Sequence, residues 1–243
     1  MNFDHIAKYY RLFEYTAFGH GLERRRTRFI TQMADSRRAL VIGDGDGRFT
    51  AALALRNPSV QIDSIDRSSQ MLRLAHRRLV KEQIVNRGRI RLIEGDIRSV
   101  PLPAGEYDLI ATHFFLDVLN DQDVRLLMER IVLAASRPCR WAVSEFDIPQ
   151  HGWRHIHAAA WVKTMYFFFR CVAGLETARL PRWRAVFRDH GFVCMNSEPA
   201  RAGLIRSEFW KLEPDNAFTE HVAERSSASN QPGCRAMGVW NTM

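Results

Sequence analysis

The fold of this chain is decided by the stretch Ala39-Leu40-Val41-Ile42-Gly43-Asp44-Gly45-Asp46-Gly47-Arg48-Phe49. Its first four residues are apolar, and an apolar run bounded by turn residues predicts a buried strand. Three glycines then follow at alternate positions. Glycine accepts backbone conformations that other residues avoid, so this alternation predicts a tight loop that a ligand can approach closely. A helical pattern begins at Phe49, and the first N–H groups of a helix can receive a carboxylate or a phosphate.

A second apolar stretch, Val60 to Ile65, ends in an acidic residue. This residue, Asp66, lies nineteen positions after Gly47. The order of strand, glycine loop, helix, strand and carboxylate is the one by which an open α/β sheet holds a nucleoside. We therefore expect Asp66 to accept hydrogen bonds from ribose hydroxyl groups.

Two further segments follow the same rhythm. A third apolar run, Ile90 to Ile93, precedes Gly95-Asp96-Ile97, where a carboxylate can accept a hydrogen bond from the exocyclic amine of adenine. A fourth segment, Tyr107 to Leu119, begins as an apolar strand that ends near Thr112 and His113. Ligands of open α/β sheets bind at the carboxyl ends of the strands, so these residues are candidates for a binding site.

In this order and spacing, the four segments resemble the class I S-adenosylmethionine-dependent methyltransferases. The resemblance spans roughly residues 37 to 145 and extends more weakly to residue 212. It implies S-adenosyl-L-methionine as the cofactor and a set of residues around it. These are Gly43, Gly45 and Gly47 at the methionine end, Asp66 at the ribose, Arg67 beside the adenine, Asp96 and Ile97 at the adenine edge, and Thr112 and His113 at the end of the fourth strand.

The glycine loop departs from the family pattern at one position. Members of the family often carry an acidic residue two positions before the first glycine, and here that position is Val41. Asp44, inside the loop, is a candidate to supply the missing negative charge near the cofactor ammonium group. The alternative is that Asp44 and Asp46 bond the backbone of the turn, as aspartate commonly does.

No catalytic triad is visible, and methyl transfer does not require one. The reaction is an in-line displacement in which positioning supplies most of the rate, and a base is needed only if the acceptor must lose a proton. His113 is the best single candidate for that base or for a group that orients the acceptor; alternatively, it lines the cofactor through its backbone alone. Tyr10, on an amphipathic helix expected over residues 3 to 18, is expected near a lid over the cofactor.

The alternation of strands and helices predicts a mostly parallel sheet that is covered on both faces. The resemblance adds a Rossmann-like, doubly wound α/β fold with seven strands and an antiparallel hairpin at the sheet edge. We expect a helical N-terminal cap over residues 1–34, a methyltransferase domain over 35–212 with a helical insertion at about 151–190, and a disordered tail over 213–243. Within these, strands are expected at about 39–42, 60–66, 90–93, 107–112, 139–146, 192–195 and 203–212, and helices at about 22–33, 49–55, 71–79, 121–135, 152–172 and 183–189.

Composition narrows the class of protein. The chain has 243 residues, of which 46% are hydrophobic and 26% are charged, as in soluble globular proteins. No run of 18 apolar residues occurs and the first residues lack a signal pattern, so a cytoplasmic protein is expected. The four cysteines are scattered without a C-x-x-C pair, which predicts reduced thiols and no metal site. The net charge of +8 can favour nucleic acid or anionic lipid, although arginine-rich helices are more often solvated faces.

These observations predict methyl transfer to a small-molecule acceptor. The aromatic run Tyr166 to Phe169 suggests an apolar pocket for an aromatic, quinone-like or lipid acceptor, or else ordinary core packing. A helical insertion before the final hairpin is similar to the quinone- and lipid-modifying branch of the family, so peripheral contact with a membrane is retained as a hypothesis. The alternatives are a nicotinamide-dependent oxidoreductase, which the glycine spacing disfavours, and a nucleic-acid-binding or non-catalytic protein of the same fold.

Overall fold

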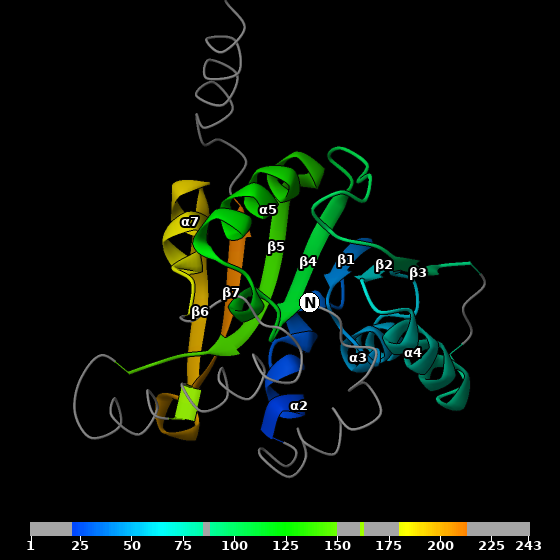
Figure 1. Ribbon diagram of the computed structural model, residues 1–243. Coiled ribbons are helices and arrows are strands. Elements are labelled where there is room, and N and C mark those ends of the chain that lie inside the picture. Colours follow the sequence, from blue (N-terminus) through cyan, green and yellow to red (C-terminus); the bar gives the residue numbers. More distant parts are fainter. Residues whose placement is uncertain (1–20, 85–87, 150–160, 163–179, 213–243) are drawn as a thin grey trace, which may run out of the picture. The chain divides into compact units, whose positions relative to one another are not determined.

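The computed structural model describes residues 21–84, 88–149, 161–162 and 180–212. All of them belong to one compact unit that ends at Glu213. Their strands form a single seven-stranded sheet in the order β3-β2-β1-β4-β5-β7-β6 (Figure 1). The strands are β1 (Arg38–Ile42), β2 (Gln61–Asp66), β3 (Ile90–Glu94), β4 (Tyr107–His113), β5 (Ala135–Phe146), β6 (Phe192–Ala200) and β7 (Ile205–Leu212).

The sheet is mostly parallel. Strand β1 pairs in parallel with β2 and with β4, β2 pairs in parallel with β3, and β4 pairs in parallel with β5. Strand β7 is antiparallel to both β5 and β6, which makes the last two strands a hairpin at one side of the sheet. The expected doubly wound α/β fold with an antiparallel edge hairpin is therefore confirmed.

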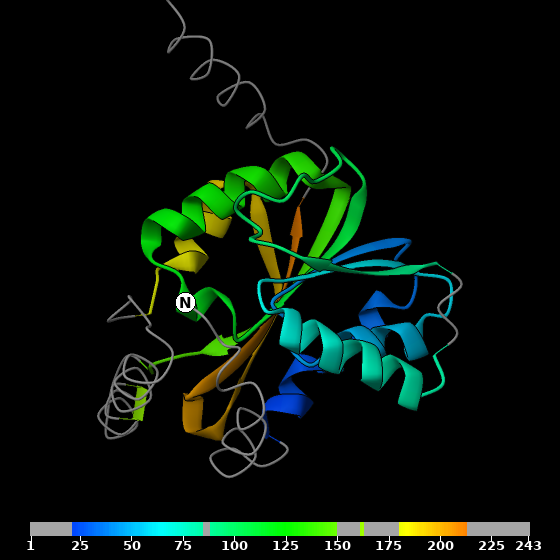
Figure 2. The ribbon, with the colours of Figure 1, turned by 45° about the vertical axis from the view of Figure 1, so that its right-hand side comes forward.

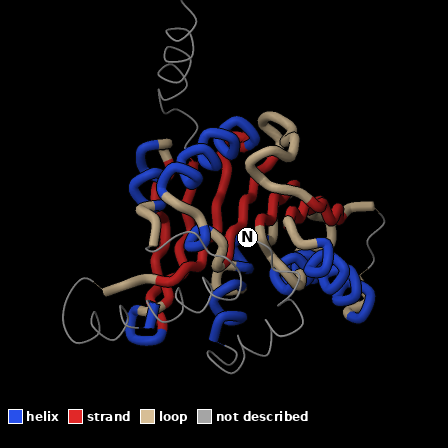
Figure 3. Tube along the Cα trace, viewed as in Figure 1, coloured by secondary structure: helices blue, strands red, loops and turns tan. Residues whose placement is uncertain are grey.

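Helices cover both faces of this sheet, as Figures 2 and 3 show. On one face lie α5 (Asp121–Ala134) and α7 (Trp183–Asp189), which pack over the buried side chains of Leu40, Ile110 and Trp141. The other face carries α3 (Arg48–Arg56), α4 (Ser69–Lys81) and the 3-10 helix η1 (Ile30–Met33). Helix α2 (Gly21–Arg26) and the short 3-10 helices η2 (Leu116–Val118) and η3 (Arg201–Gly203) lie near the strand ends. Burial on both faces explains why the central strands are almost continuously apolar.

Side-chain caps fix where two of the helices begin. The Ser68 side chain accepts a hydrogen bond from the backbone N–H of Met71 at 3.2 Å, and Asn120 accepts one from Asp123 at 2.8 Å. Both are standard N-cap interactions that satisfy otherwise unpaired N–H groups. They set the ends of α4 and α5 that face the carboxyl edge of the sheet, next to β2 and β4.

Three boundaries differ from the sequence-based expectation. The helix expected over residues 22–33 is broken between α2 and η1, because the chain turns there to bury Phe29 and Met33 in the core, and tertiary packing outweighs helical periodicity. Strand β6 continues to Ala200 instead of ending near Met195, since an edge strand accepts polar residues such as Ser197 on its exposed side. Strand β5 begins at Ala135, which pairs with Tyr107 before a bulge.

Several predictions fall on residues outside the described part of the chain. They concern the helix over residues 3–18 with Tyr10, most of the insertion at 151–190, including the aromatic run at 166–169, and the tail at 213–243. Within the insertion, the expected helix at 183–189 is present as α7. Of the helices that the structure describes, none combines the length and the apolar character that a membrane crossing requires.

Candidate functional site

The loop after β1 takes the shape that its glycines allow. Gly43, Gly45 and Gly47 have φ values of +68°, +61° and +76°, a left-handed region that other residues rarely adopt. A Cβ atom on Gly43 would collide with the Phe115 ring, and one on Gly47 would lie 2.7 Å from the Cβ of Ala75. A Cβ on Gly45 would meet only a methionine sulfur, at 3.7 Å. The first and third glycines therefore allow close packing, whereas Gly45 faces the more open side of the loop.

Asp66, at the end of β2, is tied to this loop. Its Oδ2 accepts a hydrogen bond from the backbone N–H of Gly45 at 3.1 Å, and its Oδ1 accepts one from that of Ser68 at 2.9 Å. A carboxylate has about four acceptor sites, so Asp66 can in principle accept hydroxyl donors in addition to these two backbone N–H groups. The loop and the carboxylate that the sequence predicts as a ribose site thus lie side by side.

Asp44 serves the start of α3. Its Oδ1 accepts from the N–H of Phe49 at 3.1 Å, and its Oδ2 accepts from that of Thr50 at 2.8 Å. Burial raises the pKa of this carboxyl to about 6, against the opposing effect of the Thr50 hydrogen bonds. Both oxygens are thus engaged with helix N–H groups, as the turn-backbone alternative expects; contact with a cofactor ammonium group stays a prediction.

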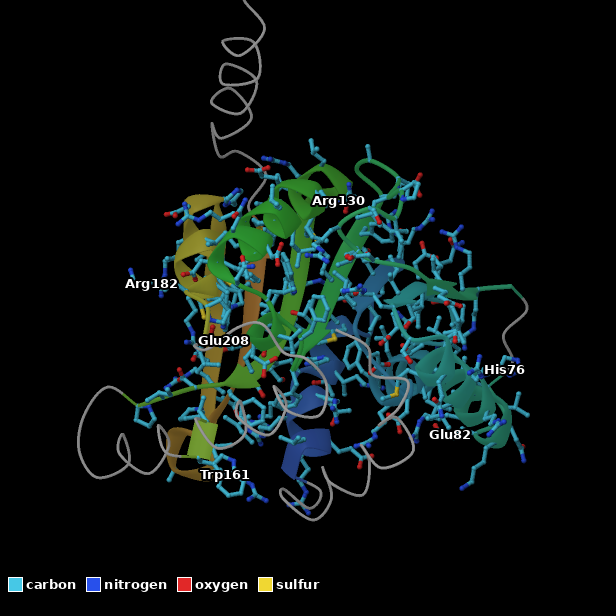
Figure 4. The ribbon with its side chains drawn as sticks, in the orientation of Figure 1. His76, Glu82, Arg130, Trp161, Arg182 and Glu208 are labelled. Atoms are coloured by element: carbon cyan, nitrogen blue, oxygen red, sulfur yellow. The ribbon has the colours of Figure 1, made fainter. Side chains whose placement is uncertain are left out.

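The residues predicted for the adenine edge lie in two different surroundings. Asp96 is held by Arg98, whose Nη2 is 2.7 Å from Oδ2, and these hydrogen bonds lower the pKa of the carboxyl. The Nε of Arg67 lies 3.8 Å from the same oxygen, so two of the predicted residues meet at this edge. Ile97 is buried in the core, and its carbonyl accepts a hydrogen bond from Arg130, a residue of α5 that is labelled in Figure 4.

Thr112 and His113 end β4 and point to opposite faces of the sheet. The Oγ1 of Thr112 accepts a hydrogen bond from the indole N–H of Trp141 at 3.0 Å, on the side of α5 and α7. The imidazole of His113 lies on the other side, 4.5 Å from the ring centroid of Phe49. Burial, with a smaller contribution from Arg26, lowers the pKa of His113 to about 3, so the ring is neutral at physiological pH. As a base for the acceptor, His113 stays a prediction.

Arg26, on α2, is a residue that the sequence analysis missed. It is buried, its guanidinium lies 5.1 Å from the centre of the Phe114 ring, and its charge lowers the pKa values of both Asp44 and His113. It belongs to the run Arg24-Arg25-Arg26, and such arginine-rich helices are more often solvated faces. One signal pointed the other way: Leu22 and Arg26 are four residues apart and share the inner face of the helix.

Two further acidic residues, Glu145 and Asp117, were also missed. Glu145, near the end of β5, is fully buried and accepts hydrogen bonds from the N–H groups of Phe115, Leu116 and Asp117 at 3.1, 2.9 and 3.4 Å. Asp117, in η2, is 93% buried. Sequence spacing carried no signal for this contact, since the two residues are brought together by the pairing of β4 with β5.

Except for Arg26 on α2, these groups lie at or after the carboxyl ends of β1, β2, β3, β4 and β5, which is where open α/β sheets bind ligands. The arrangement fits a nucleoside with a charged amino-acid tail. It offers an open glycine face, the Asp66 carboxylate bonded to the glycine loop, and an imidazole whose two ring nitrogens are buried and have no hydrogen-bond partner among the described residues.

The opposite edge of the sheet carries a different feature. A cavity of about 310 Å³ lies at the amino ends of β1, β2 and β3. It is lined by Arg38, Gln61, Asp63, Gly88, Arg89 and Arg91. The buried Asp63 ion-pairs with Arg38 and Arg91 and accepts a hydrogen bond from the Tyr107 hydroxyl. This edge is therefore occupied by a network of paired charges.

Comparison with known proteins agrees with this geometry. The model of a protein family described as "Methyltransferase domain" matches residues 39–135. The uncharacterized methyltransferase YdaC of Bacillus subtilis (strain 168) is 36% identical over 83 residues, which are 34% of this chain and 42% of that protein. The present chain therefore matches less than half of YdaC.

Solved structures share the fold. The mitomycin 7-O-methyltransferase MmcR is similar with a TM-score of 0.65 at 18% identity, covering 87% of this chain and 61% of that one. The pyocyanin biosynthetic protein PhzM has a TM-score of 0.62 at 16% identity, covering 87% and 62%. A SAM-dependent methyltransferase from Aquifex aeolicus has a TM-score of 0.54 at 12% identity, covering 77% and 89%. At these identities, the likeness concerns the fold alone.

Proposed function

We propose that this chain is a class I S-adenosylmethionine-dependent methyltransferase that transfers a methyl group from S-adenosyl-L-methionine to a small-molecule acceptor. One observation carries the proposal: the Asp66 carboxylate at the end of β2 is hydrogen-bonded to Gly45, inside a loop of three left-handed glycines. The domain match over residues 39–135 includes this loop, β2 and Asp96.

The residues around the loop suit the parts of that cofactor. Asp66 would accept from the ribose hydroxyls, Asp96 would accept from the adenine amine, and the side of the loop at Gly45 leaves room for the backbone to approach the ligand. Arg26 and His113 would lie at the methionine end, where a positive charge and neutral imidazole nitrogens would suit a carboxylate and an ammonium group. When bound, S-adenosyl-L-methionine supplies a methyl group on a positively charged sulfur that is a good leaving group.

The contribution of the protein is then mainly to hold the two reactants in line. Well-oriented reactions of this kind gain on the order of 7–11 kcal/mol over free reactants. Rigid supports for such positioning are present, because η2 is hydrogen-bonded to Glu145 and the glycine loop to Asp66. Positioning is therefore the main contribution to the rate that the proposal requires of the protein.

For the acceptor, we propose an aromatic, quinone-like or lipid molecule that is methylated on oxygen. The name of MmcR describes methyl transfer to an oxygen of a small molecule, and its fold is similar over 87% of this chain. The choice of oxygen also suits a site with buried acidic groups next to β4 and β5. The fold by itself does not define the acceptor.

We also propose a cytoplasmic location. Cys139 and Cys194 are free thiols, as expected in a reducing compartment. Peripheral contact with an anionic membrane is proposed through the outer side of α4, where Arg73, Arg77 and Lys81 are exposed. Figure 4 labels His76 on this helix and Glu82 immediately after its end.

The proposal is tested with cofactor labelled in its methyl group. The protein is incubated with the labelled cofactor and a small-molecule extract, and labelled products are separated and identified; protein heated to unfolding serves as the control. We expect a labelled small molecule and calorimetric binding of S-adenosyl-L-methionine but not of NAD or NADP. Cofactor binding with no labelled product from any extract would indicate a non-catalytic protein. If the label is found only on nucleic acid, and the affinity of the protein for nucleic acid falls steeply with salt, the acceptor is a nucleic acid and not a small molecule.

A further inference from the structure

A pair of buried acidic side chains lies beside the proposed reaction site. Glu145 is 0% exposed and Asp117 is 7% exposed, and the N–H of Asp117 donates to the Glu145 carboxylate at 3.4 Å. The two residues come from the ends of neighbouring strands, since Asp117 follows β4 and Glu145 is the last residue but one of β5. Burying two acids together is costly unless something compensates for their charge.

Two arginines on the Glu145 side of the sheet pair with other carboxylates. Arg206 lies opposite Glu145 in the register of β7, but its Nε is 2.6 Å from Asp147. Arg184, on α7, pairs with Asp147 at 3.2 Å and with Glu208 at 2.8 Å, and Glu208 is labelled in Figure 4. Within the described part of the chain, the contacts of Glu145 are three backbone N–H groups and no guanidinium.

A second observation indicates that a ligand belongs at this edge. His113 is only 5% exposed, and neither of its ring nitrogens has a hydrogen-bond partner among the described residues. Buried polar atoms normally have partners, so an unpaired imidazole suggests a group that the protein does not itself provide. His113 follows Thr112, which pairs with Ile42, so it lies beside the start of the glycine loop. It ends the same strand from which η2 and Asp117 follow.

We propose that Asp117, held beside Glu145, accepts the proton of a hydroxyl acceptor as its oxygen is methylated. The inference rests on the proposed function and deepens it, since it makes the acceptor a molecule with an ionisable hydroxyl group. The acceptor oxygen forms a bond to the methyl carbon while its O–H bond breaks. The proton goes to the Asp117 carboxylate, and the electron pair of the broken C–S bond remains on sulfur, which becomes a neutral thioether. Charge and atoms balance without any further reactant.

The proton affinity of the pair suits this role. Burial raises the pKa of Asp117 to about 7, and burial together with the negative charge of Asp117 raises the pKa of Glu145 well above its usual value. A general base works best when its pKa is near the operating pH. Glu145 is fixed by the backbone of η2 and acts as a positioning residue, whereas Asp117 is the group that takes up the proton. Other ionisable groups on the Glu145 side of the sheet are Arg184, Arg206, Glu208 and Asp147, whereas His113 lies toward Phe49 on the other face.

The test compares Asp117→Asn with the parent protein and with Asp35→Asn, which changes an exposed aspartate far from the site in sequence and in the sheet. The acceptor is the hydroxyl compound whose methylated form carries the label in the experiment described above. Ring-substituted analogues of this compound, with hydroxyl pKa values from acidic to weakly acidic, are tested beside it. We expect kcat/KM of the parent to fall below a pH of about 7. Asp117→Asn should lower kcat by 100-fold or more for weakly acidic hydroxyls, lose that pH dependence, and retain most of the rate for analogues that are already ionised.

Infrared spectra provide a readout that does not depend on activity. In protein labelled with ¹³C-aspartate, a carboxylic acid band that disappears with a midpoint near pH 7 should be present in the parent and in Asp35→Asn and absent in Asp117→Asn. Asp117→Glu, which keeps the carboxylate, should restore part of the rate and shows that the fold tolerates change at this position. Glu145→Gln should shift the midpoint.

Methyl transfer by Asp117→Asn within threefold of the parent at every pH would overturn the inference and leave the proposed function intact. Acceptors that react only through amines or carbons would overturn it as well. Failure of the parent itself to methylate any acceptor, despite binding the cofactor, would instead contradict the proposed function.

Discussion

The two edges of the sheet both carry buried acidic residues, but they neutralise them differently. At the amino edge, Asp63 is surrounded by Arg38, Arg91 and the Tyr107 hydroxyl, and Arg38 also pairs with Glu106. At the carboxyl edge, the partly buried Asp96 pairs with Arg98, but the buried carboxylates of Asp44 and Glu145 accept hydrogen bonds from backbone N–H groups. The first kind of partner is a full charge, and the second is a dipole.

The difference appears in the proton affinities. Burial alone would raise the pKa of Asp63, but the hydrogen bonds from Arg91 and Tyr107 outweigh it, so the pKa lies below its usual value. For Asp44, burial outweighs the backbone hydrogen bonds and raises the pKa to about 6. An acid that stays ionised at every physiological pH is suited to holding strands together. Acids whose pKa approaches neutrality are typical of ligand and reaction sites.

The largest loss of stability is expected from replacing a glycine of the carboxyl edge that packs closely against a neighbouring helix. Gly47→Ala places a Cβ 2.7 Å from the Cβ and 2.9 Å from the Cα of Ala75, at a φ of +76°. Left-handed strain and overpacking together should cost roughly 2–5 kcal/mol of unfolding free energy. The matched control is Gly105→Ala, before β4 at the amino edge, which has a φ of +67° but would contact nothing within 4 Å. Denaturant titration should give about 1–2 kcal/mol for this control; equal losses would mean that the packing of the glycine loop against α4 is not tight.

At the amino edge, Asp63→Asn should act on stability alone. The substitution removes the charge that Arg38 and Arg91 share, and Tyr107 loses a charged acceptor. Breaking a buried ion pair costs several kcal/mol, but Arg91 is half exposed, so a loss of about 2–3 kcal/mol is expected. Cofactor affinity, measured by calorimetry on the folded variant, should stay within twofold of the parent. A large loss of cofactor affinity would show that the amino edge also contributes to ligand binding, contrary to the proposed difference between the two edges.

Much of this contrast was predictable from the sequence and part of it was not. The apolar runs ending in Gly43, Asp66 and Thr112 predicted the strands and the carboxyl edge, because strand patterns and turn glycines are local properties. The connection between Glu145 and Asp117 depends on β4 pairing with β5, which no local pattern describes. The burial of Arg26 was not predicted, because its charge favours a solvated position. The residue is nevertheless buried, since it lies on the same inner face of α2 as Leu22.

Polar edge residues obscured other boundaries. Strand β6 extends through Asn196 and Ser197, which a local pattern assigns to a loop, because the neighbouring β7 supplies its hydrogen bonds on one side only. The partner of Asp44 was likewise ambiguous, since a loop aspartate can serve either the backbone or a ligand until α3 is placed. For β6 the missing information was its pairing with β7, and for Asp44 it was the geometry of the loop that leads into α3.

On the same strand as Asp63, Asp66→Ala should show the opposite behaviour. Loss of the carboxylate removes the proposed acceptor of the ribose hydroxyls and the hydrogen bond from Gly45. Hydrogen bonds to a charged group contribute about 1.5–3 kcal/mol, so the cofactor Kd should rise by roughly tenfold to a hundredfold. Calorimetry with Asp63→Asn as the control measures this directly. A Kd that stays within about threefold of the parent would refute the ribose assignment.

The smallest effect concerns His113 and its dependence on pH. Burial lowers its pKa to about 3, whereas an unfolded histidine titrates near 6.5, so only the unfolded state binds the proton between these values. The stability that His113 contributes is therefore complete above pH 6.5 and is lost as the pH falls, by about 1 kcal/mol between pH 6.5 and 5.5. His113→Gln should reduce the acid destabilisation of the parent by this amount, while Asp44, whose raised pKa acts in the opposite direction, is present in both proteins and cancels. In NMR spectra the His113 ring signals should stay constant from pH 8 to 5. A titration midpoint near pH 6.5 would instead mean that solvent reaches the ring, and that burial at the carboxyl edge does not keep the imidazole neutral.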